Sequence, residues 1–171
     1  RFGRIDVLVN NAGHFGASIG QHFTDQSAED WEANLAVNLT GPFYLCKAVA
    51  SGMIERRFGK IINISSIAAQ RDPIFAPGYA AAKNALLNLT RVVAKDLGPH
   101  NVNVNAICPG LLWTNFWNRM APMMVETNPA FSGLEPRQVF EKMVAQNTPL
   151  GREQVPEDIG NLVVFLASEE A

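Results

Sequence analysis

Cysteine, histidine and clustered charge are all scarce in this chain of 171 residues. The two cysteines, Cys46 and Cys108, stand far apart and form no CxxC or other metal-ligand spacing. The three histidines form no i,i+4 pair. We therefore expect no bound metal, and we expect two buried free thiols in a reducing compartment.

Long apolar runs and basic runs are missing as well. No stretch reaches the roughly 18 apolar residues that a transmembrane helix needs, and residues 1–4 do not resemble the start of a signal peptide. The formal net charge of −2, without any run of Lys or Arg, argues against a nucleic-acid-binding or membrane-surface protein. We therefore expect a cytoplasmic protein whose partners are small molecules or protein chains, with no nucleic acid and no membrane.

Three short segments rich in Val and Ile predict β-strands at residues 5–9, 60–64 and 102–107. The sequence predicts a long helix over residues 27–57, with Ser27 as its N-cap and a kink at Gly41-Pro42. Further helices are predicted over residues 79–97 and from Pro156 onwards. Strands that alternate with helices form βαβ units, so we predict a single α/β domain over residues 1–171, with a parallel sheet and helices on both of its faces.

Residues 111–150 interrupt this regular alternation. The segment is too long and too aromatic for an ordinary connection between a strand and a helix, so we predict a substrate lid within the domain. Its Trp, Phe and Met residues are typical either of a partly apolar substrate pocket or of lid helices that pack on the domain. The sequence leaves both interpretations open.

Tyr79 and Lys83 lie four residues apart on a predicted helix and therefore on the same helical face. Ser66 precedes them at the end of the second predicted strand, and ligands of parallel α/β sheets bind at such strand ends. An ammonium group beside a phenol stabilises the phenolate, so we expect Lys83 to lower the pKa of Tyr79 from its usual value near 10. A Tyr and a Lys at this spacing are a weak signal alone, so the interpretation depends on neighbouring motifs.

Further motifs follow the other predicted strands and the helix kink. They are Asn10-Asn11-Ala12-Gly13 after the first strand, Asn38 before the kink, Ser65-Ser66 after the second strand, and Pro109-Gly110 with Thr114 after the third. Together with the Tyr-x-x-x-Lys pair, this series resembles the core of the short-chain dehydrogenase/reductase family across essentially the whole chain. The resemblance implies a partial Rossmann-like, doubly wound parallel sheet.

The resemblance also implies roles for individual residues. Tyr79 would be the general acid/base, Lys83 its electrostatic partner, and Ser66 the residue that holds the substrate oxygen. Asn38 would help to position a water molecule that links Lys83 to solvent, whereas Ser65 would pack or cap. The implied contacts to the cofactor, NAD or NADP, come from Asn11, Ala12, Gly13, Tyr79, Lys83, Pro109, Gly110 and Thr114.

The chain departs from the family pattern at both ends. Members normally carry a TGxxxGxG turn and a second strand that selects NAD or NADP, and we find neither here. Gly13, Gly16 and Gly20 have the wrong spacing for a phosphate-binding turn and predict a flexible loop. We therefore expect a fragment that lacks the N-terminal glycine-rich cofactor loop and the C-terminal strand.

The implied activity is hydride transfer between a nicotinamide cofactor and a secondary alcohol or ketone. The resemblance further implies a homodimer or homotetramer at full length. Two alternatives stay open at this point: a non-catalytic or regulatory protein on the same scaffold, and epimerase or dehydratase chemistry, which uses similar motifs.

Overall fold

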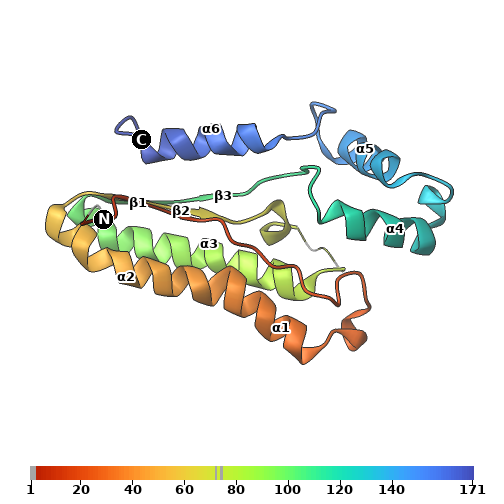
Figure 1. Ribbon diagram of the computed structural model, residues 1–171, viewed down its shortest axis with the longest axis horizontal. Helices are drawn as coiled ribbons and strands as arrows, with labels where there is room; N and C mark the ends of the chain where they lie inside the picture. Colours follow the sequence, from red (N-terminus) through yellow and green to blue (C-terminus); the bar gives the residue numbers. More distant parts are fainter. Residues whose placement is uncertain (1–2, 72, 74) are drawn as a thin grey trace. The chain divides into compact units, whose positions relative to one another are not determined.

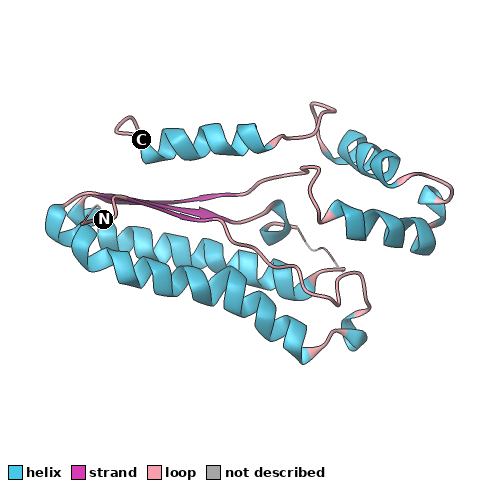
Figure 2. Ribbon diagram, viewed as in Figure 1, coloured by secondary structure: helices cyan, strands magenta, loops and turns pink. Residues whose placement is uncertain are grey.

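The computed structural model describes residues 3–71, 73 and 75–171. Strands and helices alternate along the chain (Figures 1 and 2). The strands are β1 (Val7–Asn10), β2 (Gly59–Ile64) and β3 (Val102–Ile107). The α-helices are α1 (Ala28–Leu35), α2 (Gly41–Arg56), α3 (Pro77–Leu97), α4 (Trp117–Thr127), α5 (Pro136–Asn147) and α6 (Pro156–Ala167). The shorter helical segments are η1 (Phe23–Asp25), η2 (Ala36–Thr40), η3 (Ile67–Ala69), η4 (Gly98–His100) and η5 (Pro129–Phe131).

The three strands form one parallel sheet in the order β1-β2-β3. The register places Asn10 opposite Asn63 and Ile64 opposite Ile107, so all three strands end at the same edge. Figure 1 shows α2 and α3 on one side of the strands and α6 on the other. The predicted α/β class, with a parallel sheet and helices on both faces, is therefore confirmed.

The long predicted helix is continuous but changes its winding in the middle. Its first turn begins as expected, because the Ser27 hydroxyl accepts a hydrogen bond from the backbone N–H of Asp30. The predicted break at Gly41-Pro42 is a π-helical segment, η2, that ends immediately before Gly41. Pro42 lies in the first turn of α2, where the fixed φ of proline suits a helix.

The core beneath the sheet lies where α2 and α3 meet the strands. It contains Cys46, Met53, Ile61, Leu97, Val102 and Val104, all buried. Gly59 at the start of β2 permits this close packing, because a Cβ atom there would lie 2.4 Å from the sulfur of Met53. Both cysteines are free, as expected, but only Cys46 is fully buried, and Cys108 is partly exposed.

The chain divides into two compact units, one of residues 1–108 with 160–171 and one of residues 109–159. The second unit contains the predicted lid segment. Its core is formed by the side chains that α4, η5 and α5 bury, namely Trp117, Met120, Ala121, Phe131, Val139, Phe140 and Val144. Ring contacts join Phe140 to Trp113 and Trp117, at centroid distances of 5.2 and 4.7 Å. These contacts favour packing as the role of the buried aromatic residues.

Two kinds of feature are absent from the described residues. None of the helices in residues 3–71, 73 and 75–171 is long and apolar enough to cross a membrane. In the same part of the chain, His, Cys, Asp and Glu side chains form no group of three or more that could hold a metal ion.

Candidate active site

Asn38 lies in the π-helical segment η2 and is completely buried. Its side-chain amide pairs with the backbone of His14: Nδ2 donates to the His14 carbonyl at 2.7 Å, and Oδ1 accepts from the His14 N–H at 3.1 Å. Nδ2 also donates to Oδ1 of Asn34 at 3.2 Å. The buried amide therefore uses its donor and acceptor groups to hold the loop that follows β1.

Ser65 and Ser66 follow β2 directly, and their hydroxyl groups have different partners. Ser65 is buried, and its hydroxyl donates to the backbone carbonyl of Lys83 at 2.9 Å. Ser66 is partly exposed, and its hydroxyl accepts from the N–H of Ala68 at 3.1 Å, which caps η3. Ser65 packs and bonds to the helix as expected, which leaves Ser66 as the serine that faces the candidate site.

Tyr79 and Lys83 lie in the first two turns of α3. The Ser66 side chain forms a hydrogen bond with Tyr79, and Nζ of Lys83 lies 5.7 Å from the centre of the Tyr79 ring. Lys83 is only 3% exposed, and its Nζ donates to the carbonyl of Ile64 at 2.7 Å. The structure thus brings together three of the four expected catalytic residues at the carboxyl edge of the sheet.

The pKa values of this pair differ from the expectation. Burial raises the pKa of Tyr79 above its usual value, and the hydrogen bond from Ser66 lowers it by a smaller amount. Burial also lowers the pKa of Lys83 to about 8. The expected lowering of the Tyr79 pKa by Lys83 is therefore wrong for this chain, because desolvation of the phenolate outweighs the stabilising contacts.

The last residue of β1 is buried, and the three residues that follow it are exposed. Asn10 is buried, and its Nδ2 donates to Oδ1 of Asn63 at 2.7 Å. Asn63 in turn donates to the hydroxyl of Thr90 on α3 at 2.9 Å. Asn11, Ala12 and Gly13, the expected cofactor contacts, follow Asn10 and are all exposed.

The sequence interpretation missed this hydrogen-bonded series from β1 through β2 to α3. The signal that could have revealed it is the parallel register, because Asn10 and Asn63 both stand at strand ends that pair with each other. It also missed Phe15, whose ring lies 4.6 Å from that of Tyr79. No sequence pattern predicts that contact, because it depends on how the loop after β1 folds back towards α3.

The loop with Gly13, Gly16 and Gly20, which we predicted to be flexible, is held by hydrogen bonds to α1. Both the N–H and the hydroxyl of Ser18 donate to the carboxylate of Asp30 on α1. A hydrogen bond from the backbone of Ala17 lowers the pKa of Asp30 most, and the two bonds from Ser18 lower it further. The loop continues into the single turn η1, and this turn does not form a phosphate site at a long helix N-terminus.

Three expected cofactor contacts, Pro109, Gly110 and Thr114, belong to the second compact unit. Within that unit, Oε1 of Gln154 accepts from the N–H of Gly110 at 2.5 Å, and the N–H of Gln154 donates to the carbonyl of Leu111 at 3.0 Å. Gln154 therefore fixes the backbone that follows Pro109. Thr114 is exposed.

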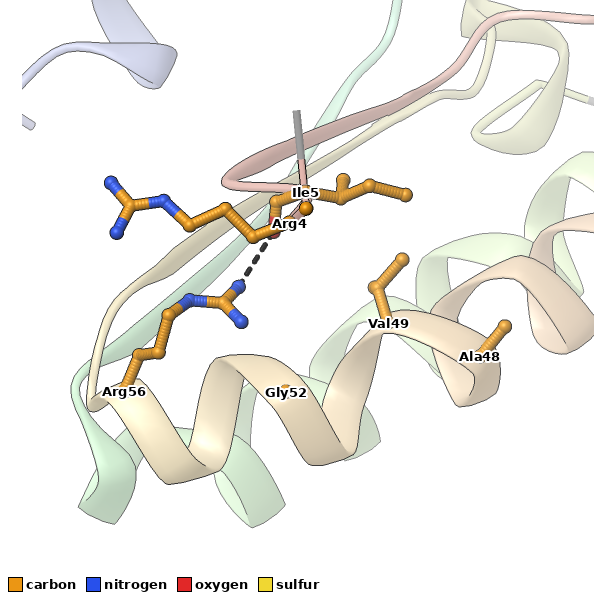
Figure 3. Close-up of a pocket in the computed structure, with 7 residues that line it drawn as sticks. Arg4, Ile5, Ala48, Val49, Gly52 and Arg56 are labelled. Carbon is orange, nitrogen blue, oxygen red and sulfur yellow. Dashed lines mark hydrogen bonds between the residues drawn. The ribbon is translucent and has the colours of Figure 1, made fainter. Parts of the chain in front are cut away.

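A pocket of about 520 Å³ lies near the amino end of β1, apart from the candidate residues (Figure 3). Its lining comes from Gly3, Arg4, Ile5, Ala48, Val49, Gly52 and Arg56. Arg56 donates to the carbonyl of Ile5 at 2.7 Å, and both arginines form ion pairs with Asp6. These partners account for the charges around the pocket, and we assign no chemistry to it.

The parallel sheet has helices on both faces, and Ser66, Tyr79 and Lys83 lie near the carboxyl ends of its strands. This arrangement defines a Rossmann-type α/β domain. The family model described as Enoyl-(Acyl carrier protein) reductase matches residues 1–171. The chain therefore belongs to the short-chain dehydrogenase/reductase family.

Individual relatives agree with this assignment. The chain is 37% identical to the acetoacetyl-CoA reductase of Shinella zoogloeoides, over 99% of this chain and 63% of that protein. It is 39% identical to the galactitol 2-dehydrogenase of Agrobacterium fabrum (strain C58 / ATCC 33970), over 99% of this chain and 64% of that protein. The crystal structure of NAD⁺-bound xylitol dehydrogenase matches with a TM-score of 0.87 at 33% identity, over 99% of this chain and 64% of that chain. The chain thus spans less than two thirds of the length of these relatives.

Proposed function

We propose that the protein is an NAD(P)-dependent oxidoreductase that transfers a hydride between a nicotinamide cofactor and a secondary alcohol or ketone. The observation that supports this most directly is the hydrogen bond between Ser66 and Tyr79 beside the buried ammonium of Lys83. A phenol, a hydroxyl and a cation that lie together near the carboxyl ends of the strands can bind and protonate a carbonyl oxygen.

Tyr79 has the properties of a proton donor. Because burial raises its pKa, the phenol keeps its proton at neutral pH and can donate it to the oxygen of a ketone during reduction. Ser66 can hold the same oxygen, since its hydroxyl reaches Tyr79. Lys83 supplies positive charge that opposes the negative charge left on the tyrosine after the proton has moved.

The residues near the carboxyl ends of the strands also have the chemical groups that a nicotinamide cofactor needs. The Lys83 ammonium has three N–H donors, and the bond to Ile64 uses one of them, so the others can reach ribose hydroxyl groups. Asn11, Ala12 and Gly13 are exposed and would lie along the adenosine side of the cofactor, and Pro109, Gly110 and Thr114 would border the nicotinamide. When bound, the cofactor would supply or accept the hydride.

Two further assignments belong to the same proposal. Asn38 would help to position a water molecule near Lys83, since the η2 segment that carries Asn38 packs against α3. Residues 111–150 would close over the substrate as a lid. The named activities of the relatives, on an acyl-CoA ketone and on a sugar alcohol, support an alcohol or ketone as the substrate class.

Replacement of the Tyr79 hydroxyl tests the proposal. In the natural protein, Tyr79→Phe keeps the ring but removes the proton, so turnover should fall by at least about a hundredfold while the Kd for the cofactor stays within about twofold. Tyr44→Phe is the matched control, because Tyr44 is 62% exposed on α2. A Tyr79→Phe protein that keeps more than about a tenth of its turnover would show that Tyr79 is not the acid.

A further inference from the structure

Phe15 packs against the ring of Tyr79 from the loop that follows β1. The two ring centres lie 4.6 Å apart, and the ring planes are inclined by 34°. This separation is at the short end of the range in which aromatic pairs attract each other. We propose that Phe15 is a positioning residue that holds the Tyr79 ring in the orientation needed for proton transfer, an assignment that rests on the proposed function of Tyr79.

The backbone before Phe15 is fixed by Asn38. The two hydrogen bonds between the buried Asn38 amide and the backbone of His14 hold the residue that immediately precedes Phe15. Asn38 is completely buried, so solvent does not compete for these bonds. The position of Phe15 is therefore tied to helix segment η2.

The backbone after Phe15 is fixed by α1. Gly16 has a φ of +81°, and a Cβ atom there would lie 3.0 Å from Nδ2 of Asn34 and 3.1 Å from Cγ of Asp30. Only glycine combines this φ with such a close approach without strain. Ser18 then bonds to Asp30, and the N–H of Gly20 donates to the carbonyl of Phe75 at 2.6 Å. The loop is thus anchored on both sides of Phe15.

Among the described residues, three neighbours in space, Ser66, Lys83 and Phe15, act on the Tyr79 side chain. Ser66 bonds to Tyr79, Lys83 places its ammonium 5.7 Å from the ring centre, and Phe15 packs on the ring. Of the three, only Phe15 limits rotation of the ring through a broad apolar surface. A displacement of about 1 Å in a reacting group can cost about a hundredfold in rate, so the loss of this surface should reduce turnover.

Kinetics of four variants of the natural protein provide the first part of the test. Phe15→Ala should lower kcat by about tenfold or more, with a Kd for the cofactor within about twofold of the original. Phe15→Leu keeps apolar bulk without a ring and should also lower kcat, whereas Phe15→Tyr keeps the ring and should leave kcat near its original value. Phe23→Ala is the matched control, because Phe23 is 76% exposed and lies in η1, away from Ser66, Tyr79 and Lys83 in the sequence.

Titration of the Tyr79 hydroxyl provides the second part, which does not depend on activity. Phenolate absorbance near 295 nm is recorded for the original protein, Phe15→Ala and Phe15→Leu, and each curve is corrected with the same protein carrying Tyr79→Phe. Phe15 shields the ring from water, so the Phe15→Ala titration should move to lower pH by about one unit. The groups that contact Tyr79, Ser66 and Lys83, are unchanged in this comparison.

The two readouts separate the possible outcomes. A fall in kcat together with a shifted titration supports the proposal. A fall in kcat with an unchanged titration, a shifted titration with unchanged kcat, or full activity of Phe15→Leu would each overturn it. High turnover of Tyr79→Phe would instead contradict the proposed function. The titration would still show whether Phe15 shields the Tyr79 ring, because it does not depend on activity.

Discussion

The side-chain ammonium of Lys83 donates to the backbone carbonyl of Ile64 at 2.7 Å, joining α3 to the last residue of β2. A second bond runs in the opposite direction, from the hydroxyl of Ser65 to the carbonyl of Lys83 at 2.9 Å. The two bonds fix the register of the helix against the strand end. Because Tyr79 lies one turn before Lys83, and Ser66 follows Ser65, this register also brings Tyr79 to Ser66.

Substitution of the two adjacent serines should separate these structural and chemical roles. Ser65→Ala removes the buried hydrogen bond to the carbonyl of Lys83 and should lower the free energy of unfolding by about 0.5–1.5 kcal/mol. Ser66→Ala should instead lower turnover, with a smaller change in stability, because Ser66 is partly exposed and faces Tyr79. Urea denaturation and steady-state kinetics of the natural protein measure the two effects. Equal loss of turnover in both variants would contradict the assignment of Ser66.

The lowered pKa of Lys83 predicts how stability depends on pH. Burial holds the folded-state pKa at about 8, below the ordinary value of 10.5, so the folded protein binds the proton less tightly than the unfolded chain. The free energy of unfolding should therefore rise between about pH 8 and 10.5. The contribution of Lys83 to this rise is at most about 3 kcal/mol. Below pH 8 the full penalty of the buried charge is present.

Lys83→Met is the control for this prediction, since it removes the titrating group and keeps an apolar chain of similar length. The difference in unfolding free energy between the two proteins should change over the stated pH range, and the ¹³Cε NMR signal of Lys83 should titrate near pH 8. A titration midpoint near 10.5 would show that burial does not act on Lys83 in this way.

The fold could be predicted largely from local sequence patterns. Apolar runs located all three strands, and β3 occupies the predicted residues 102–107. The first strand is displaced to Val7–Asn10, because the buried amide of Asn10 pairs with Asn63 and extends the strand beyond its apolar residues. Hydrophobicity alone does not predict a strand that ends in a buried polar residue.

The site could be predicted only where its residues form sequence motifs. Ser66, Tyr79 and Lys83 lie together as their motifs indicated. Asn38, in the π-helical segment, bonds to the backbone of His14, which is 24 residues away in the sequence, and Phe15 of the same loop contacts Tyr79. Tertiary contacts of this kind carry no local signal.

Exposed apolar residues on α2 and α3 predict that the natural protein forms dimers or tetramers. Phe43 and Leu45 on α2 are 44% and 50% exposed, and Val92 on α3 is 57% exposed. Helix faces of this kind are typical of interfaces between identical subunits. Leu45→Glu and Val92→Glu should therefore shift the protein towards the monomer in sedimentation experiments, whereas Leu150→Glu, at a position that is 79% exposed in the second unit, should not. A monomer at micromolar concentration before any substitution would contradict the prediction.

The exposure of β1 indicates that residues 1–171 will self-associate when they are expressed alone. Among the described strands β1 pairs only with β2, and Ile5, Val7 and Val9 are 54%, 38% and 38% exposed. An apolar strand edge with unpaired N–H and C=O groups associates readily with other chains, and neither Pro nor Lys occurs within residues 5–9 to prevent it. We expect this chain to self-associate. Val7→Lys should reduce the association seen by light scattering, whereas Phe23→Lys, off the sheet, should not.

The same chain should bind neither NAD(H) nor NADP(H) measurably. The pyrophosphate of a dinucleotide is normally held by backbone N–H groups of a glycine-rich turn at a helix N-terminus, and residues 1–171 contain no GxGxxG or TGxxxGxG sequence. The loop with Gly16 and Gly20 does not replace that turn, because Asp30 already holds its Ser18 and the loop leads into the short η1. Contacts from Asn11, Lys83 and their neighbours would have to offset the ordering of a long flexible ligand unaided. Isothermal titration of the purified chain decides the question, since a micromolar Kd for either nucleotide would show that the glycine-rich turn is not needed.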